Sequence, residues 1–278
     1  MGTPSTAETA AVDTHRVVTD LTISTTKLDP RIWHRIEKDL HLCTSEQSAW
    51  LYVALASEEK AAAMGLLVVK DIRVSDEKPP NSSSGHSWES RPGGIWVLRG
   101  KGEFGQAVTM VDVLFGVDAV DPRRRWTLMR SPLQLDAQPD VPVARLSVRR
   151  GRAELGPGAR PALRVRGDGR FKIVQISDTH MVTGVGVCRD AIDAQGKYLP
   201  ESEADPLTVE FIGRILDVEK PDLVVLTGDQ LHHDILDSQS ALLKVVAPII
   251  ERALPFAAVF GNHDSEGMHA LSREWLFS

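Results

Sequence analysis

The chain has 278 residues, of which 42% are hydrophobic and 25% are charged. This composition is typical of globular proteins, and the length predicts two domains of roughly 100–200 residues each. The 32 basic and 38 acidic side chains give a net charge of −6, which argues against a nucleic acid or an anionic membrane as the partner. The longest apolar run, residues 61–69, is too short to span a membrane, because a span needs about 20 apolar residues.

The cysteine content favours a reducing compartment. Cys43 and Cys188 lie far apart, whereas secreted disulfide scaffolds contain many more cysteines. Residues 1–11 have neither the apolar core nor the basic flank of a signal peptide. We therefore expect a cytoplasmic protein.

The chain opens with a small, polar segment that we expect to be disordered over residues 1–28. An Asp-Pro pair at 29–30 then resembles the start of a helix. Ile32, Ile36 and Leu40 follow at helical spacing, which predicts a short helix.

Strand-like segments dominate the rest of the first half. Residues 49–56 are typical of a buried strand, and residues 79–94 are rich in Pro, Ser and Gly, which predicts a loop. Further strands are expected at 95–98, 108–115, 126–129 and 144–149. In the last of these, apolar Ala144, Leu146 and Val148 alternate with polar residues, as in a half-exposed strand. We therefore predict a β-rich domain over residues 29–150.

A segment rich in Gly and Pro, residues 151–169, is the predicted linker to a second domain at 170–278. In that domain, short apolar strands alternate with helices. The expected strands are 172–176, 223–226 and 256–260, and the expected helices begin at Asp205-Pro206 and at residue 239. This order is typical of a parallel sheet covered on both faces.

Two details of the helices follow from the sequence. In the first helix, Leu207, Phe211, Ile215 and Val218 form the predicted buried face. In the second helix, over residues 239–252, Pro248 predicts a kink or a division.

Each strand of the second domain is followed by polar residues. The tripeptide Asp178-Thr179-His180 follows the first strand, Gly228-Asp229 the second, and Gly261-Asn262-His263-Asp264 the third. Because ligands bind outside the carboxyl ends of strands in open α/β sheets, these side chains should converge. Carboxylate oxygens with imidazole favour Mn, Fe or Zn, and the absence of clustered cysteines argues against a thiolate site.

The order Asp178-x-His180, Gly228-Asp229 and Gly261-Asn262-His263-Asp264 resembles the first three blocks of the calcineurin-like metallophosphoesterase family. Within that family, residues 171–267 and the segment 87–94 are similar to fungal phosphatases of the dosage-dependent cell-cycle-regulator type. The resemblance implies an α/β (α+β) chain, in which a β-rich region precedes the first part of an αββα sandwich.

The resemblance also implies a role for each residue. Asp178 and His180 would hold one of two divalent or trivalent metal ions, Asp229 would bridge both ions, and Asn262 would bind the second. His263 would contact the phosphate and protonate the leaving group. Asp264 would orient and stabilise the His263 imidazole.

Two neighbouring histidines are less determined by the sequence. His232 stands three residues after Asp229, where a purple acid phosphatase has a tyrosine ligand, so it is a candidate contact to metal or substrate. The alternative for His232 and His233 is a pair of solvated loop histidines.

The implied activity is hydrolysis of a phosphoric ester bond by attack of metal-bound hydroxide. The expected substrate is a phosphorylated protein, modified on Ser or Thr, or a small phosphomonoester. The family pattern continues with a further histidine and a Gly-His-x-His segment. The later histidine of this sequence, His269, stands in Gly-Met-His-Ala, which does not match that pattern. We therefore expect a partial domain with weak metal binding, and the alternative function is an inactive binding protein. The oligomeric state does not follow from the sequence.

Overall fold

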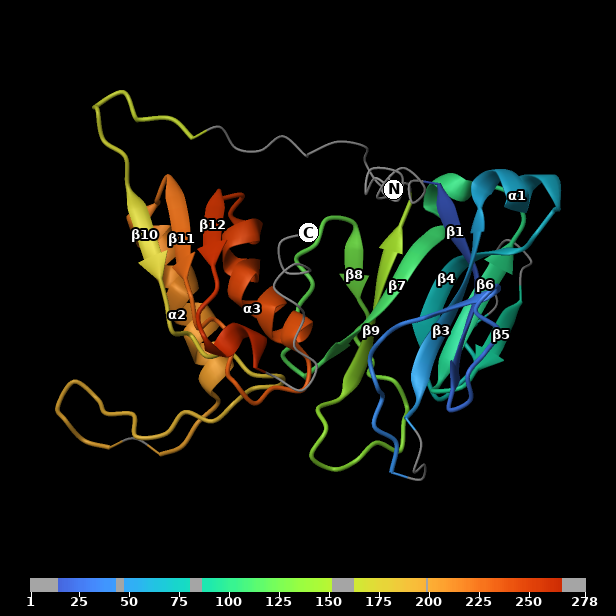
Figure 1. The fold of residues 1–278 in the computed structure, drawn as a ribbon, viewed down its shortest axis with the longest axis horizontal. Helices are drawn as coiled ribbons and strands as arrows, with labels where there is room; N and C mark the ends of the chain where they lie inside the picture. The colour runs from blue at the N-terminus through green and yellow to red at the C-terminus, as the bar shows by residue number, and fades with distance from the viewer. Residues whose placement is uncertain (1–14, 44–47, 81–86, 152–162, 199, 267–278) are drawn as a thin grey trace, which may run out of the picture. The chain divides into compact units, whose positions relative to one another are not determined.

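The computed structural model describes residues 15–43, 48–80, 87–151, 163–198 and 200–266 (Figure 1). The chain divides into two units. The N-terminal unit comprises Met1–Val113, Arg124–Pro139 and Ala144–Gly158, and the C-terminal unit comprises Leu114–Arg123, Asp140–Val143 and Ala159–Ser278. Two short segments of the first half, Leu114–Arg123 and Asp140–Val143, thus belong to the C-terminal unit.

The strands of the first half form three small sheets among the described residues, with orders β1-β3-β2, β4-β6-β5 and β7-β9-β8. One short helix, α1 (Glu58–Ala63), follows β3. The strands are β1 (Arg16–Ser24), β2 (Trp33–Arg35), β3 (Trp50–Ser57), β4 (Val68–Val74), β5 (Trp88–Arg91), β6 (Ile95–Gly100), β7 (Val108–Phe115), β8 (Trp126–Leu128) and β9 (Ala144–Arg150). The predicted β-rich first half is confirmed.

Apolar residues spaced two apart drive these pairings, because alternate side chains of a strand point to the same face. Ala144, Leu146 and Val148 of β9 are all buried, as their alternation predicts. Leu51 of β3 and Ile95 of β6 are among the largest fully buried side chains.

Three predictions for the first half are wrong. Residues 16–24 are not disordered but form β1, which pairs antiparallel with β3; the other disordered residues of that prediction, 1–14, lie outside the described part. The segment expected to be helical contains strand β2, because Trp33–Arg35 pairs with Ala54–Tyr52 and this pairing overrides the helical spacing. The predicted loop 79–94 contains β5, whose Trp88 is buried.

The C-terminal unit contains the predicted parallel sheet. Its strands are β10 (Ile173–Ile176), β11 (Leu223–Thr227) and β12 (Phe256–Val259), in the order β10-β11-β12. Helix α2 (Ala204–Glu219) connects β10 to β11, and α3 (Ser238–Glu251) connects β11 to β12 (Figure 1). All three strands therefore direct their carboxyl ends to one edge of the sheet. Of the predicted linker, residues 152–162 lie outside the described part.

Three expectations for this sheet and its helices need correction. Helix α2 buries Ile212 and Leu216, whereas Phe211 and Val218 of the predicted face are exposed; four-residue spacing alone did not identify the stripe that packs on the sheet. Val224 and Leu226 are buried on one face of β11. The opposite face carries exposed Ile173 and Val259, so it is not covered by the described residues. Helix α3 is continuous through Pro248.

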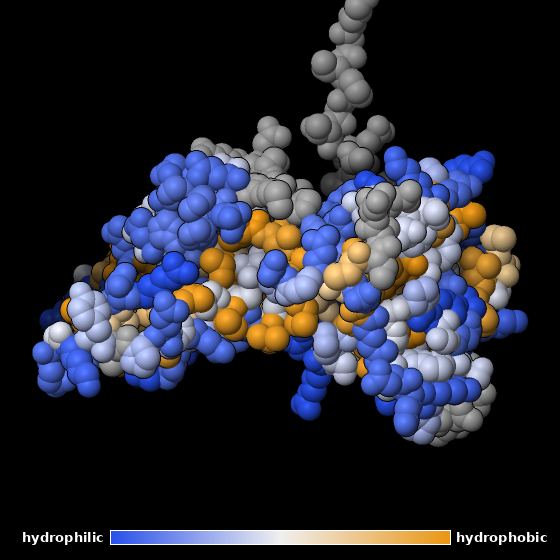
Figure 2. All heavy atoms as spheres, turned by 90° about the horizontal axis from the view of Figure 1, so that it is seen from below, coloured by the Kyte–Doolittle hydropathy of each residue, from blue (hydrophilic) through white to orange (hydrophobic). Residues whose placement is uncertain are grey.

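Exposed apolar side chains are not confined to that face. Figure 2 shows apolar side chains interspersed among polar ones on the surface that it presents. Among the described residues, no helix is both long enough and apolar enough to cross a bilayer.

A buried lysine joins the helices of the C-terminal unit to the loop after β10. Lys244 of α3 is 2% exposed. Its Nζ lies 2.8 Å from Asp118 Oδ2, donates to the Gly184 carbonyl at 2.6 Å, and contacts Asp205 Oδ2. Burial raises the pKa of the Asp205 carboxyl, and the hydrogen bond from Lys244 opposes that rise. The network fixes the loop that begins with the candidate site residues.

Candidate metal centre

Three loops at the carboxyl ends of β10, β11 and β12 bring the predicted metal ligands together. One donor atom from each of Asp178, His180 and Asp229 lies within 4.8 Å of the other two. Donors in the shell of one metal ion, each about 2.0–2.2 Å from the ion, must lie a few ångströms apart. These three side chains therefore have the spacing that a shared cation requires.

The backbone at these ligands is unusual. Asp178, His180 and Asp229 all have positive φ, at 55°, 45° and 51°, in the left-handed region that side chains with a Cβ adopt rarely. Strain of this kind costs of the order of 1–3 kcal/mol per residue and is concentrated at functional sites. The same three residues that form the candidate metal cluster therefore also hold the strained backbone.

Backbone hydrogen bonds hold the first two loops in this conformation. Asp178 N donates to the Gly228 carbonyl and His180 N to the Asp229 carbonyl, each at 3.1 Å. Met181 N donates to the Gln230 carbonyl at 2.9 Å. The parallel pairing of β10 with β11 thus continues into the loops. It sets the distance of Asp178 and His180 in the first loop from Asp229 in the second.

Two glycines are required by close approach of the loops. A Cβ on Gly228, where φ is +107°, would lie 2.8 Å from Gly261 N. A Cβ on Gly261 would lie 2.0 Å from Asp229 Oδ1. Side chains at these positions would collide with the second and third loops, which explains the Gly-Asp and Gly-Asn pairs in the sequence.

Asp264 ties the third loop to the second. Its carboxylate is 2% exposed, and Oδ2 accepts hydrogen bonds from Asp229 N at 3.0 Å and Gly261 N at 2.7 Å. Its Oδ1 accepts from Leu231 N at 2.9 Å. This carboxylate therefore positions the backbone of Asp229, a structural role that the sequence did not indicate.

His263 is held by a different acid from the one predicted. Its Nδ1 lies 2.7 Å from Glu266 Oε2, and this contact raises the pKa of the His263 imidazole. The Asp264 charge is a smaller contributor in the same direction. The role of His263 as the proton donor, and of Asp264 in supporting it, stays a prediction.

Four imidazoles lie close together at the site, and one of them, His180, belongs to the cluster. The ring centroids of His180 and His263 are 5.4 Å apart, and those of His180 and His232 are 6.1 Å apart. His233 lies 4.1 Å from His232 and 5.4 Å from His263. Burial and the neighbouring imidazoles lower the pKa of His232. His232 and His233 thus both lie beside the site. The sequence indicated this position only for His232, as a candidate contact.

Asn262 begins the short turn that carries His263 and Asp264. It follows Gly261, whose Cα faces Asp229 Oδ1, and His263 N donates to that same oxygen at 3.0 Å. The third loop therefore lies directly against Asp229. The role of Asn262 as a second-metal ligand stays a prediction.

These observations together fit a metal ion. The donors are carboxylate oxygens and imidazole nitrogens, which suit first-row transition metals. The donor atoms of Asp178, His180 and Asp229 lie close together, and Gly228 and Gly261 allow the second and third loops to approach each other.

The comparisons with known proteins agree with this arrangement. Residues 171–278 match the family model of the calcineurin-like phosphoesterases. Phosphatase DCR2 of Saccharomyces cerevisiae is 40% identical over 162 residues, which cover 58% of this chain and 27% of that protein. Probable inactive purple acid phosphatase 28 of Arabidopsis thaliana is 41% identical over 106 residues, which cover 37% of this chain and 26% of that protein.

A third relative, Protein SIA1 of Kluyveromyces lactis, is 30% identical over 189 residues. That alignment covers 63% of this chain and 31% of the relative, so it extends into the N-terminal half. The chain spans about a quarter of the length of the first two relatives. The family match, the fold and the three loops agree, and residues 171–278 are similar to a calcineurin-like phosphoesterase domain.

Proposed function

We propose that this chain contributes the metal centre of a phosphoesterase that hydrolyses phosphomonoesters, with phosphorylated Ser or Thr in proteins as the substrate class. The observation that carries the proposal is the cluster of Asp178, His180 and Asp229, whose donor atoms lie within 4.8 Å of one another. The relative named as a phosphatase supports the same activity.

Each candidate ligand has a proposed role in metal binding that follows from its loop. Asp178 and His180 hold one cation from the first loop. Asp229 accepts a hydrogen bond from His263 N of the third loop, and its carboxylate, which has two oxygens, would help to hold both ions. Asn262 offers an amide oxygen from the third loop. A pair of bound Mn, Fe or Zn ions supplies Lewis acidity and a nucleophile derived from water at neutral pH.

The histidines would act on the substrate. His263 keeps its proton more firmly than an ordinary histidine because of Glu266, which suits a group that donates a hydrogen bond to phosphate and a proton to the leaving oxygen. His232 and His233 border the same space and would add hydrogen-bond donors to the phosphate oxygens.

Metal titration of the purified chain tests the first part of the proposal. We expect Mn²⁺ to bind weakly, because the described ligands supply few donors for two ions. Asp229→Asn should weaken that binding at least about tenfold, since a neutral amide bridges cations poorly. The matched control is Asp168→Asn, which removes an exposed charge in the same unit. Equal Mn²⁺ affinity in the chain and in Asp229→Asn would remove Asp229 from the site.

Hydrolysis assays at saturating Mn²⁺ test the second part. We expect low turnover of 4-nitrophenyl phosphate that disappears in Asp229→Asn. Preference for bis(4-nitrophenyl) phosphate would indicate a phosphodiesterase instead.

A second candidate function is a binding protein that retains the metal site without turnover. Relatives whose names include the words "probable inactive" favour it. Metal binding that depends on Asp229, combined with no turnover of either ester, would support this candidate over the hydrolase.

We also propose a cytoplasmic location, because the two cysteines, Cys43 and Cys188, are both free thiols. Cell fractionation checks it, and recovery in a secreted fraction would contradict it.

A further inference from the structure

The N-terminal unit contains a groove of about 870 Å³ along the edge of sheet β1-β3-β2. We propose that this groove binds an acidic segment of a partner polypeptide in an extended conformation. All of its lining residues belong to the N-terminal unit. The proposal therefore does not depend on the phosphoesterase activity.

The lining of the groove is strongly basic. It contains one acidic side chain, Glu37, and six basic ones, which are Arg16, Lys27, Arg31, His34, Arg35 and Lys60. The whole chain has a net charge of −6, so this local excess of cations opposes the overall balance. A surface of one sign attracts a ligand of the other sign and directs its approach.

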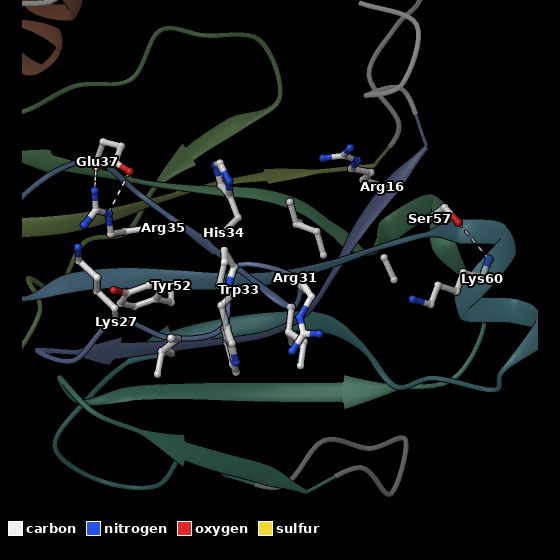
Figure 3. A pocket seen from close by; sticks show the side chains of 15 residues that line it. Arg16, Lys27, Arg31, Trp33, His34, Arg35, Glu37, Tyr52, Ser57 and Lys60 are labelled. Carbon is white, nitrogen blue, oxygen red and sulfur yellow. Dashed lines mark hydrogen bonds and ion pairs between the residues drawn. The ribbon is translucent and has the colours of Figure 1, made fainter. Parts of the chain in front are cut away.

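Two of these cations are available to a ligand. Lys27 and Lys60 are exposed, and neither has an ion-pair partner within the part of the chain that the structure describes. Figure 3 shows them at opposite ends of the labelled lining residues, with Trp33 and Arg31 between them. A ligand that engages both must therefore be elongated.

Two arginines of the lining can exchange partners. Arg31 pairs with Asp29 at 2.7 Å, and the Arg31 side chain is 88% exposed. Arg35 pairs with Glu37 and lies 4.7 Å above the ring centroid of Trp50. Exposed ion pairs contribute only ~0–1 kcal/mol to stability, so a carboxylate of an incoming ligand can replace these local partners at little cost.

The open edge of β3 argues for a polypeptide ligand. Strand β2 pairs only with Tyr52–Ala54 of β3. The next residues, Leu55–Ser57, have a strand partner on the β1 side alone among the described residues. An extended peptide can add to such an edge through main-chain hydrogen bonds, while its alternate side chains reach neighbouring pockets.

The dimensions fit a short extended segment. At a rise of roughly 3.3 Å per residue, the open stretch Leu55–Ser57 is about 10 Å long and can pair with about three residues of peptide. Partly buried Leu55 and exposed Ile32 offer apolar contact within the lining. In a peptide of alternating acidic and apolar residues, the acidic side chains would pair with the cations and the apolar ones would contact Leu55 and Ile32.

A polynucleotide is the competing occupant, since aromatic and basic side chains also bind single strands. It fits less well, because a nucleic acid cannot use the main-chain edge of β3. The net negative charge of the chain also repels a long polyanion.

Fluorescence anisotropy with the full 278-residue chain tests the proposal. The probe is a short labelled peptide of alternating Glu and Val. We expect it to bind more tightly than a Lys-Val peptide or a single-stranded oligonucleotide of similar length, and to weaken as salt is raised. Tighter binding of the oligonucleotide, or no binding of the acidic peptide, would overturn the proposal.

Paired variants locate the binding. Lys27→Gln with Lys60→Gln should weaken the acidic peptide about tenfold, because two ionic contacts are lost. The control, Lys78→Gln with Lys101→Gln, removes the same charge from exposed positions of the same unit outside the groove and should leave the affinity unchanged. Equal effects of the two pairs would show a diffuse charge effect and refute the groove.

A second probe tests the strand edge. The same peptide, methylated on alternate backbone amides, cannot complete the main-chain hydrogen bonds and should bind about tenfold more weakly. Unchanged affinity would exclude β3 as the docking edge.

Discussion

Replacement of Lys244 by methionine should destabilise the C-terminal unit while leaving the N-terminal unit intact. The two side chains have similar length, so the substitution removes the charge and leaves little cavity. Lys244 contacts two carboxylates, of Asp118 and Asp205, and it is almost fully buried. Because removal of one partner leaves buried charge uncompensated, the expected loss is about 3–5 kcal/mol.

The expected loss depends on pH. Burial already raises the pKa of Asp205, and removal of the lysine removes the interaction that opposes this rise. An acid whose pKa is raised in the folded state is destabilising when it must ionise, so the penalty is small below its unfolded pKa of about 3.9 and grows as the pH rises above that value. The difference between the variant and the parent should therefore be larger at neutral pH than at pH 4.

Two spectroscopic signals separate the two units. Every tryptophan among the described residues lies in the N-terminal unit, at positions 33, 50, 88, 96 and 126. Helices α2 and α3, of 16 and 14 residues, lie in the C-terminal unit, whereas α1 has 6 residues. The sixth tryptophan, Trp275, belongs to the second unit and is replaced by Trp275→Phe in all variants. Tryptophan fluorescence then follows the first unit, and circular dichroism at the helical band follows mainly the second.

Urea denaturation measures the effect. With a slope of about 1.5–2 kcal/mol per molar urea, a loss of 3–5 kcal/mol shifts the dichroism midpoint by about 2 M. The fluorescence midpoint should not move. The control is Lys197→Met, an exposed lysine of the same unit. An unshifted dichroism midpoint in Lys244→Met, or equal shifts of both midpoints, would refute the reasoning.

Three further predictions follow from the site and from the ion pairs. Gly261→Ala should weaken Mn²⁺ binding about tenfold in a calorimetric titration with little change in helix content, because the new Cβ would collide with the Asp229 carboxylate; unchanged affinity would contradict the close approach. The hydrogen bond from Arg99 lowers the pKa of Glu89, so its contribution is present above pH ~4.3 and lost as the pH falls; Glu89→Gln should flatten the acid decline of the fluorescence midpoint, and an unchanged decline would argue against this pair. His232 should titrate below an ordinary histidine in an NMR experiment on the metal-free chain, since burial disfavours its charged form; a normal or higher midpoint would show that the ring is solvated.

The sequence predicted the strands of the parallel sheet well, because the apolar pattern of each strand and the order of strands and helices indicate the same structure. Each strand is a short apolar run followed by glycine or polar residues, and the βαβ order leaves few alternatives. The loop residues Asp178, His180 and Asp229 were identified for the same reason, since they follow strands whose carboxyl ends must meet. The convergence of these side chains required only the direction of the strands.

The errors arose where distant residues decide the structure. Trp33–Arg35 has helical spacing on both sides, yet the pairing with β3 makes it a strand. The buried stripe of α2 depends on where the sheet lies, so Ile212 and Leu216 replace the expected residues. The role of Asp264 as an acceptor for three backbone amides was equally invisible, because those amides belong to other loops.

The hydrogen bonds of the Asp264 carboxylate also imply an order in which the loops fold. The amides of Asp229 and Leu231 find their acceptor 35 and 33 residues further along the chain. Until β12 has joined β11, the second loop has no partner for these groups and no reason to keep Asp229 in its left-handed conformation. Cation affinity should therefore emerge late during folding, when the third strand docks, and a metal ion cannot act as the nucleus around which this unit first forms.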